Sequence, residues 1–249
     1  MSAKNPSTRY LKHLSLKDFG EQGQGRLKNA SVLQIGAGGL GSASLLYLAA
    51  AGVGRIGVAD DEAVELSNLQ RQILYKSCDE GRTKVDCARL QLEALNPDVR
   101  VQTYQQRVTA VNIESLINEY DFIISGVDTF EAKLLINDAC VLSSRPFSHA
   151  SAMQYEGQIF TYVPGAGCLR CLFPDRLSLI LQGPCKAEGI LGPVAGIMGT
   201  LQATEVIKYF LGAGDLLANR FINFSALEMN FCEIRFKPNG ACPLCGDLQ

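Results

Sequence analysis

The sequence has little excess charge of either sign and no long uninterrupted apolar run. Its 249 residues carry 23 Lys and Arg against 25 Asp and Glu, a net charge of −2, so nothing favours binding to nucleic acid or to an anionic membrane. The longest apolar stretches, such as SASLLYLAAAGVG, are too short and too rich in glycine to span a bilayer. The polar first residues contain no apolar leader segment, so we expect a cytoplasmic location. The two histidines, His13 and His149, have no ligand partners near them in the sequence, and we assign them surface or core positions.

Cysteine, by contrast, is abundant, with nine residues. Because no export signal is evident, we expect reduced thiols, and clustered cysteines then indicate metal binding or chemistry rather than disulfides. The length and the hydrophobic fraction of 47% are those of a soluble globular protein with one sizeable core.

Strand and helix patterns alternate through the first 150 residues. Apolar strands are predicted at 30–35, 55–60, 99–106, 121–128 and 146–151, and helices at 40–51, 81–97 and 129–144. This alternation predicts an α/β fold with a Rossmann-like, doubly wound and mostly parallel sheet. Residues 1–29 are predicted to form helix and turn, with GEQGQG (20–25) interrupting the helical pattern.

The pattern changes after about residue 150. GQIFTYVP (157–164) predicts an edge strand, PVAGIMGTLQATEVIKYFLG (193–212) a helix of small residues, and RFINFSALEMNFCEIRF (220–236) a hairpin. These segments are expected to append an antiparallel edge to the same sheet. No linker separates two independent units, so we expect one domain over 1–249, built from an N-terminal helical segment (1–29), a nucleotide-binding core (30–150) and a C-terminal part (151–249).

IGAGGLGS (35–42) forms a glycine turn of the GxGxxG type between a strand and a helix. Gly36 allows the tight turn, Gly38 lets backbone amides approach phosphates, and Gly41 permits close helix–strand packing, while Gly39 adds a further small residue. The following helix N-terminus attracts anions. Asp60, 24 residues after Gly36 at the end of the next strand, is placed to bind ribose hydroxyls. This context favours a nucleotide site over a turn without a ligand, and leaves the kind of nucleotide open.

The polar residues that follow bear on the kind of nucleotide. Asn68, Arg71 and Gln72 lie in SNLQRQ, Lys84 begins the next helix, and Asp128 ends a buried strand. If the loop returns over the nucleotide, the two cations face a phosphate chain, and a carboxylate at that sheet edge is a natural Mg²⁺ ligand. Taken singly, these residues fit a surface ion pair, a solvated helix position and a helix cap. Together they favour ATP consumption over hydride transfer to a nicotinamide.

Two CxxC pairs, Cys168 with Cys171 and Cys242 with Cys245, supply four thiolates with the spacing of a tetrahedral Zn²⁺ site. A redox pair or unrelated buried thiols are the alternatives, but one CxxC suits redox chemistry better than two matched ones. With four protein ligands the zinc would be structural and would join the chain's end to its middle.

Cys185 differs from the paired cysteines because it lies in the polar stretch LQGPCKAEG beside Lys186. An exposed thiol next to a cation is reactive more often than a buried one, so we favour a reactive thiol slightly over a chance loop residue. The other four cysteines are predicted to be small buried hydrophobes: Cys78, Cys87, Cys140 and Cys232.

GAGGLGS, AGVGRIGVADDEAVELSNLQRQIL, GRTKVDCA and GPVAGIMGTLQATEVIK closely resemble the ThiF/MoeB/HesA family, bacterial relatives of ubiquitin-activating enzymes. The resemblance extends from about Arg9 to Gly246, and SNLQRQ is its most specific marker. It implies ATP-dependent adenylylation of the C-terminal Gly-Gly carboxylate of a small ubiquitin-like sulfur carrier protein, with release of pyrophosphate.

The resemblance also implies roles for individual residues. Asp60 would bind the ribose, Asn68, Arg71 and Lys84 the phosphates, and Asp128 the Mg²⁺. The family carries the same four cysteine ligands for zinc and a cysteine at the position of Cys185, which in some members takes part in sulfur transfer. A homodimer is expected as well, in which an N-terminal basic residue reaches the partner's ATP.

Two positions depart from the family pattern. Lys12 stands where the family has a second arginine, which keeps the positive charge but loses the bidentate fork. GVDTF replaces a Thr-Asp-Asn sequence, so Asp128 keeps its carboxylate while its neighbours differ.

The hairpin FINFSALEMNFCEIRF (221–236) is a candidate landing surface for the carrier, although the same residues also fit a core. A cysteine desulfurase or another protein is the expected sulfur donor.

Two other function classes stay open at the level of sequence. One is an NAD-dependent oxidoreductase that uses the glycine turn, and the other is a non-catalytic nucleotide-binding scaffold, which Lys12 alone encourages. The sequence does not decide whether the carrier belongs to thiamine, molybdopterin or a related sulfur pathway.

Overall fold

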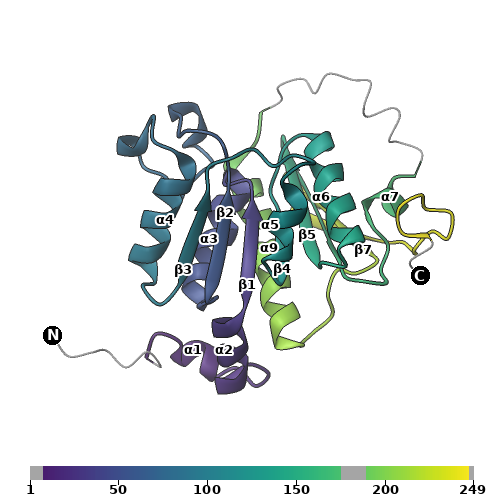
Figure 1. The fold of residues 1–249 in the computed structure, drawn as a ribbon, viewed down its shortest axis with the longest axis horizontal. Coiled ribbons are helices and arrows are strands. Elements are labelled where there is room, and N and C mark those ends of the chain that lie inside the picture. Colours follow the sequence, from purple (N-terminus) through teal and green to yellow (C-terminus); the bar gives the residue numbers. More distant parts are fainter. Residues whose placement is uncertain (1–7, 175–188, 247–249) are drawn as a thin grey trace.

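The computed structural model describes residues 8–174 and 189–246, which are built around an eight-stranded sheet (Figure 1). The strands are β1 (Ser31–Ile35), β2 (Arg55–Ala59), β3 (Arg100–Tyr104), β4 (Phe122–Ser125), β5 (Phe147–Met153), β6 (Glu156–Tyr162), β7 (Arg220–Ser225) and β8 (Asn230–Arg235). Their order in the sheet is β3-β2-β1-β4-β5-β6-β7-β8. The first five are parallel, and the last three continue the sheet in antiparallel fashion. The predicted α/β fold with an appended antiparallel edge is confirmed.

The strand order reverses at β1. From β1 the chain moves outward to β2 and β3, then crosses to β4 on the other side of β1 and continues to β5. Ile35, the last residue of β1, pairs with both Ala59 of β2 and Ser125 of β4, so these three strands end at the same position along the sheet. In doubly wound sheets, ligands bind outside the carboxyl ends of the strands at this reversal.

The direction of the antiparallel strands decides which turns join that edge. Since β6 and β8 run opposite to the parallel strands, the β5–β6 and β7–β8 turns lie at the carboxyl edge, on the side of the glycine turn. The two turns are joined, because Ala226 N–H donates to the Tyr155 carbonyl over 2.9 Å. The segment that follows residue 188 joins them as well, since Leu191 N–H donates to the Gln154 carbonyl.

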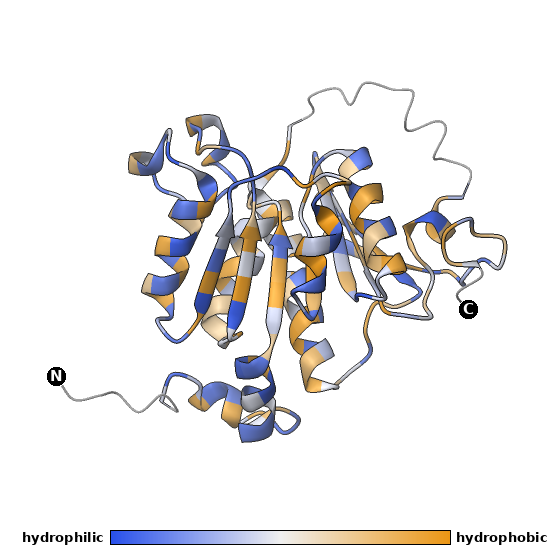
Figure 2. Ribbon diagram, viewed as in Figure 1, coloured by the Kyte–Doolittle hydropathy of each residue, from blue (hydrophilic) through white to orange (hydrophobic). Residues whose placement is uncertain are grey.

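Helices cover both faces of the sheet (Figure 1). They are α1 (Leu11–Leu14), α2 (Gly20–Asn29), α3 (Gly39–Ala51), α4 (Lys84–Leu95), α5 (Ile113–Asn118), α6 (Phe130–Leu142), α7 (Leu169–Leu172) and α9 (Gly192–Leu211), with short 3₁₀ turns η2 (Leu66–Asn68) and η3 (Ser77–Asp79). Helices α3, α4 and α9 pack with one core cluster, α5 and α6 pack with a second, and α9 also contributes to a third. Figure 2 shows hydrophobic residues along the central strands, as expected for strands buried on both faces.

The long helix α9 approaches α3 very closely. A Cβ on Gly199 would lie 2.1 Å from the Leu40 carbonyl oxygen, so the crossing requires glycine at that position. The same packing brings the start of α9 to the glycine turn, where a Cβ on Gly39 would lie 3.0 Å from the Ala195 Cβ. The small residues of this helix therefore serve packing at the turn.

Three details of the sequence prediction were wrong or incomplete. GEQGQG does not interrupt the helix but lies within α2, because the tight contact of Gly23 with Leu211 and the burial of Leu27 outweigh the low helix propensity of glycine. β6 is an interior strand rather than an edge strand, since it pairs with β5 and β7. The six-residue helix α5 was not predicted, because so short an element shows little periodicity.

The N-terminal segment packs under the amino ends of the strands. Tyr10 OH accepts from the Asn96 side chain over 2.8 Å, and Arg9 donates to the Leu95 carbonyl at the end of α4. Helix α2 leads directly into β1 (Figure 1). Within residues 8–174 and 189–246, none of the helices combines the length and apolar character needed to cross a membrane.

Candidate nucleotide site and four-cysteine cluster

The glycine turn occupies the carboxyl end of β1, beside the end of β4. Gly36 has φ +87°, and a Cβ there would lie 2.8 Å from the Gly126 carbonyl oxygen. A Cβ on Gly41 would lie 2.4 Å from the Gly36 carbonyl oxygen, so the turn closes only with glycine at both positions. Beneath it, the buried Gln34 amide donates to the Gly36 carbonyl over 2.9 Å and fixes the turn.

Asp60 follows β2 and is bonded to this turn. Its Oδ2 accepts from Ala37 N–H over 2.7 Å, and its Oδ1 accepts from Glu62 N–H over 2.9 Å. Burial raises the pKa of the Asp60 carboxyl, and these two N–H donors and the nearby Lys84 charge oppose that rise. The carboxylate is thus fixed at the sheet edge next to the glycine turn.

The SNLQRQ segment folds back over the glycine turn. The Arg71 Cγ lies 3.3 Å from where a Cβ on Gly39 would be, and its guanidinium donates to the Ser67 carbonyl over 3.2 Å. The Gln72 amide donates to Asn68 Oδ1 over 2.9 Å and lies 3.7 Å from a Cβ position on Gly38. Within the described ranges, the Arg71 side chain makes no ion pair with a carboxylate, so its charge is available to an anionic ligand.

The Gln72 side chain also carries an unsatisfied polar atom. Its side chain is 3% exposed, and its Oε1 has no hydrogen-bond partner. A buried amide oxygen without a partner is rare in folded proteins and costs free energy. Tyr75, which sequence reasoning missed, supports the same turn by donating to the Ala37 carbonyl over 2.7 Å.

Lys84 is the first residue of α4, and its side chain is only 2% exposed. Its Nζ pairs with Glu62 Oε2 at 2.5 Å, while its backbone N–H donates to the Glu62 carbonyl over 3.0 Å. The interpretation of Lys84 as a solvated helix residue was therefore wrong. Glu62 was also missed, although it stands two residues after Asp60 in the acidic run ADDE.

Asp128 lies beyond the end of β4, one residue before Thr129 caps α6 by accepting from Ala132 N–H. The Asp128 side chain is exposed, and it makes no hydrogen bond or ion pair with the other residues described. The alternative role as the helix cap belongs to Thr129 instead. An exposed, unengaged carboxylate at the carboxyl edge fits the donor chemistry that Mg²⁺ prefers.

The other two predicted site residues do not join this group. Lys12 is exposed on α1, which packs at the amino edge of the sheet, away from the glycine turn of its own chain (Figure 1). Cys185 lies outside the described residues. Of the two histidines, His149 is buried in β5 with its Nδ1 3.3 Å from Ser125 Oγ, and burial lowers its pKa well below the usual range.

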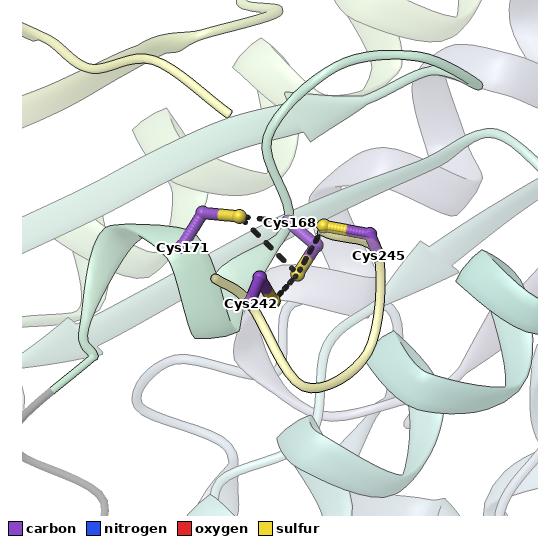
Figure 3. A group of neighbouring side chains, drawn as sticks. All are labelled: Cys168, Cys171, Cys242 and Cys245. Atoms are coloured by element: carbon purple, nitrogen blue, oxygen red, sulfur yellow. Dashed lines mark hydrogen bonds between the residues drawn. The ribbon is translucent and has the colours of Figure 1, made fainter. Parts of the chain in front are cut away.

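The four paired cysteines converge in one buried cluster (Figure 3). Cys168 Sγ lies 3.9, 3.8 and 3.6 Å from the sulfurs of Cys171, Cys242 and Cys245, and Cys171 Sγ lies 3.3 Å from Cys245 Sγ. Two thiolates on one tetrahedral Zn²⁺ are about 3.8 Å apart, whereas disulfide sulfurs are about 2.05 Å apart. The donor set and its spacing fit zinc. Because β6 and β8 both end at the amino edge, the cluster lies away from the nucleotide site.

The remaining cysteines divide into two groups. Cys87 and Cys140 are buried, as predicted. Cys78 and Cys232 are exposed, so their interpretation as buried hydrophobes was wrong. Cys232 belongs to β8, whose residues are all exposed at the end of the sheet, and Cys78 lies in η3.

Comparison with known proteins decides the family. The model of the ThiF family matches residues 10–244. The chain belongs to the ThiF family. This ThiF-family chain is 40% identical over 245 residues to the sulfur carrier protein adenylyltransferase of Thermus thermophilus, an alignment that covers 96% of this chain and 90% of that one.

Two further relatives differ in length. The SAMP-activating enzyme E1 of Haloferax volcanii is 38% identical, over 96% of this chain and 88% of its own. The adenylyltransferase and sulfurtransferase MOCS3 of Aedes aegypti is 41% identical over 98% of this chain, but the ThiF-family chain spans only 56% of its length. These relatives are adenylyltransferases or activating enzymes by name.

Solved structures agree on the fold. The crystal structure of E. coli MccB with MccA-N7isoASN matches with a TM-score of 0.86 at 24% identity, covering 97% of this chain and 75% of that chain. MccB with ATP matches with a TM-score of 0.83, also at 24% identity, over 98% of this chain and 75% of its own.

Proposed function

We propose that this ThiF-family chain uses ATP to adenylylate the C-terminal Gly-Gly carboxylate of a small ubiquitin-like sulfur carrier protein. A carboxylate oxygen of the carrier attacks the α-phosphorus of ATP, the bond from that phosphorus to the bridging oxygen breaks, and pyrophosphate leaves. The product is a carrier acyl-adenylate for later sulfur transfer. The observation that carries the proposal is the SNLQRQ loop folded over the glycine turn, which sets Arg71 beside Gly39.

Different residues position the nucleotide and neutralise its charge. The turn glycines and the start of α3 receive the phosphates, and Asp60 holds the ribose. Arg71 and Lys84 neutralise the negative charge that develops on the phosphates, with Asn68 and Gln72 donating hydrogen bonds beside them. Asp128 would hold Mg²⁺, which supplies charge neutralisation at the phosphates when bound.

Zinc has a structural role in the proposal. Cys168, Cys171, Cys242 and Cys245 form a closed set of four ligands, which leaves no open coordination position for a substrate. The ion would join the segment after β6 to the segment after β8, and thereby fix the edge of the sheet.

The globular body of the carrier protein needs a surface on which to rest. β8 is exposed along its whole length, and the β7–β8 hairpin leaves Leu227, Met229, Phe231 and Ile234 between 48% and 74% exposed. Such an apolar surface fits a protein partner.

We further propose a homodimer in which Lys12 serves the nucleotide site of the partner subunit. We also propose a cysteine desulfurase or another protein as the sulfur donor, with Cys185 as a candidate thiol for that transfer.

The rival functions have less support. Hydride transfer does not need Arg71 next to the glycine turn or Lys84 near Asp60, and the adenylyltransferase relatives argue against an NAD-dependent oxidoreductase. A non-catalytic scaffold stays compatible with the geometry and is separated by assay. The thiamine, molybdopterin and related pathways are all compatible with the site.

Carrier-dependent ATP–pyrophosphate exchange tests the proposal. A panel of sulfur carriers, each with its terminal Gly-Gly intact or deleted, is assayed with the wild type, Arg71→Ala and the control Arg89→Ala, whose guanidinium pairs with Asp86 on the surface of α4. We expect exchange with one intact carrier, its loss on deletion and in Arg71→Ala, and normal exchange in the control. ATP binding without exchange for any carrier would overturn adenylylation in favour of the scaffold.

A further inference from the structure

The ion pair between Lys84 and Glu62 is very unequal in exposure. Lys84 is 2% exposed, whereas Glu62 is 67% exposed, although their charged atoms are 2.5 Å apart. Lys84 also begins α4, where the partial positive charge of a helix N-terminus disfavours a cation. A buried cation in this place needs a counter-ion. Among the residues described, Glu62 is the one whose carboxylate forms an ion pair with it.

The other nearby carboxylate is already engaged. Both oxygens of Asp60 accept backbone N–H groups, from Ala37 and from Glu62 itself. The backbone of Glu62 is also fixed, because its carbonyl accepts from Lys84 N–H. Only the Glu62 side chain is therefore free to turn away, and it covers the Lys84 ammonium on the solvent side.

We propose that Glu62 is a displaceable counter-ion, which covers Lys84 in the free protein and gives way to the phosphates of the bound nucleotide. The inference rests on the proposed function in that Lys84 meets those phosphates. The Glu62 carboxylate and a phosphate compete for the Lys84 ammonium group, because two anions that both contact it lie close enough to repel each other. Glu62 moves into water at little cost since its side chain is already mostly exposed, and it returns to Lys84 when pyrophosphate leaves.

The direction of the effect follows from charge. Removing the negative charge of Glu62 strengthens the attraction of Lys84 for phosphate, so Glu62→Gln should bind ATP about tenfold more tightly. The gain should grow from AMP to ADP to ATP as phosphates are added. Pyrophosphate should likewise inhibit exchange at a lower concentration in Glu62→Gln than in the wild type, because in the variant pyrophosphate no longer competes with the Glu62 carboxylate for Lys84.

Calorimetric titration with ATP, ADP and AMP, in the absence of any carrier, tests the inference. The matched control is Glu65→Gln, an exposed acid of the same loop whose carboxylate accepts only from Ser67 Oγ in the described structure. We expect tighter ATP binding in Glu62→Gln, unchanged AMP binding, and wild-type constants in Glu65→Gln. Equal ATP affinity in wild type and Glu62→Gln, weaker binding, or an equal gain for AMP would overturn the inference.

A second pair of variants shows whether Glu62 acts through Lys84. In a Lys84→Met background, adding Glu62→Gln should change ATP affinity less than twofold, since the group it competes for is gone. A full tenfold gain in that background would overturn the inference. If Lys84→Met does not fold, the AMP, ADP and ATP series still decides. Normal ATP binding without exchange would count against adenylylation only, whereas no ATP binding by the wild type would overturn both.

Discussion

Replacing Gly36 with alanine tests the geometry of the nucleotide turn. Gly36 has φ +87°, and an alanine Cβ there would meet the Gly126 carbonyl oxygen at 2.8 Å, a contact with backbone that side-chain rotation does not relieve. The left-handed conformation costs a non-glycine residue roughly 1–2 kcal/mol, and with the contact we expect a loss of about 3 kcal/mol. For a chain of this size, that lowers Tm by roughly 6–12 °C.

The matched control is Gly25→Ala in α2, where a Cβ would meet no atom within 4 Å. In a helix interior, alanine is more favourable than glycine by up to about 1 kcal/mol, so this variant should raise Tm by a few degrees. Scanning calorimetry gives both values, and titration with ATP should show that only Gly36→Ala loses binding. Similar Tm shifts in the two variants, or intact ATP binding by Gly36→Ala, would refute the reasoning.

Three further variants address the metal, the pH dependence and the carrier. Cys242→Ser should release the zinc and lower Tm, both measured on the same preparation by metal analysis and calorimetry. His149→Gln should make the free energy of unfolding less sensitive to acid. Burial lowers the pKa of His149, so below about pH 6.5 the unfolded chain takes up a proton that the folded chain does not. In the wild type, this proton uptake lowers the free energy of unfolding by up to about 1.4 kcal/mol per pH unit. Phe231→Glu should raise the KM for the carrier in exchange assays and leave ATP affinity unchanged.

Each of these variants has a control in the same chain. Cys232→Ser, at an exposed thiol, should keep the zinc. For His149→Gln the control is the wild-type chain, whose free energy of unfolding in urea titrations should fall more steeply below about pH 6.5. Val111→Glu, at a side chain that is 94% exposed, should leave the carrier KM unchanged. The opposite pattern in any pair would contradict the role given to the first member.

The parts of the fold that depend on local pattern were predictable. Apolar runs such as FIIS of β4 and the glycine turn between β1 and α3 identify the parallel sheet and its nucleotide edge, because each pattern reflects burial or steric demands within a few residues. The continuation of helix α2 through Gly23 was not predictable in this way, since a Cβ there would meet Leu211, nearly 190 residues away in the chain, as well as the nearby Phe19.

The candidate site was predicted residue by residue but not contact by contact. The motif spacing indicated Asp60 and Lys84, yet not that Glu62 would cover Lys84, because that ion pair forms when the loop after β2 pairs with the segment before α4. The interior position of β6 also depends on pairing with β7, which follows the long helix α9. Assignments of ligand roles to Asp60, Arg71 and Asp128 stay predictions, as do the boundaries within 1–249.

The reversal of strand direction after β5 sets the reach that a protein substrate needs. It puts the β7–β8 turn and the glycine turn on the same edge, separated by the five strand intervals from β8 to β1. Neighbouring strands are about 4.8 Å apart, so the distance along that edge is about 24 Å. An extended chain covers about 3.4 Å per residue, and so about seven residues bridge it. A carrier body resting on β8 therefore needs a free tail of about that length, and a carrier with a much shorter tail would dock without presenting its carboxylate.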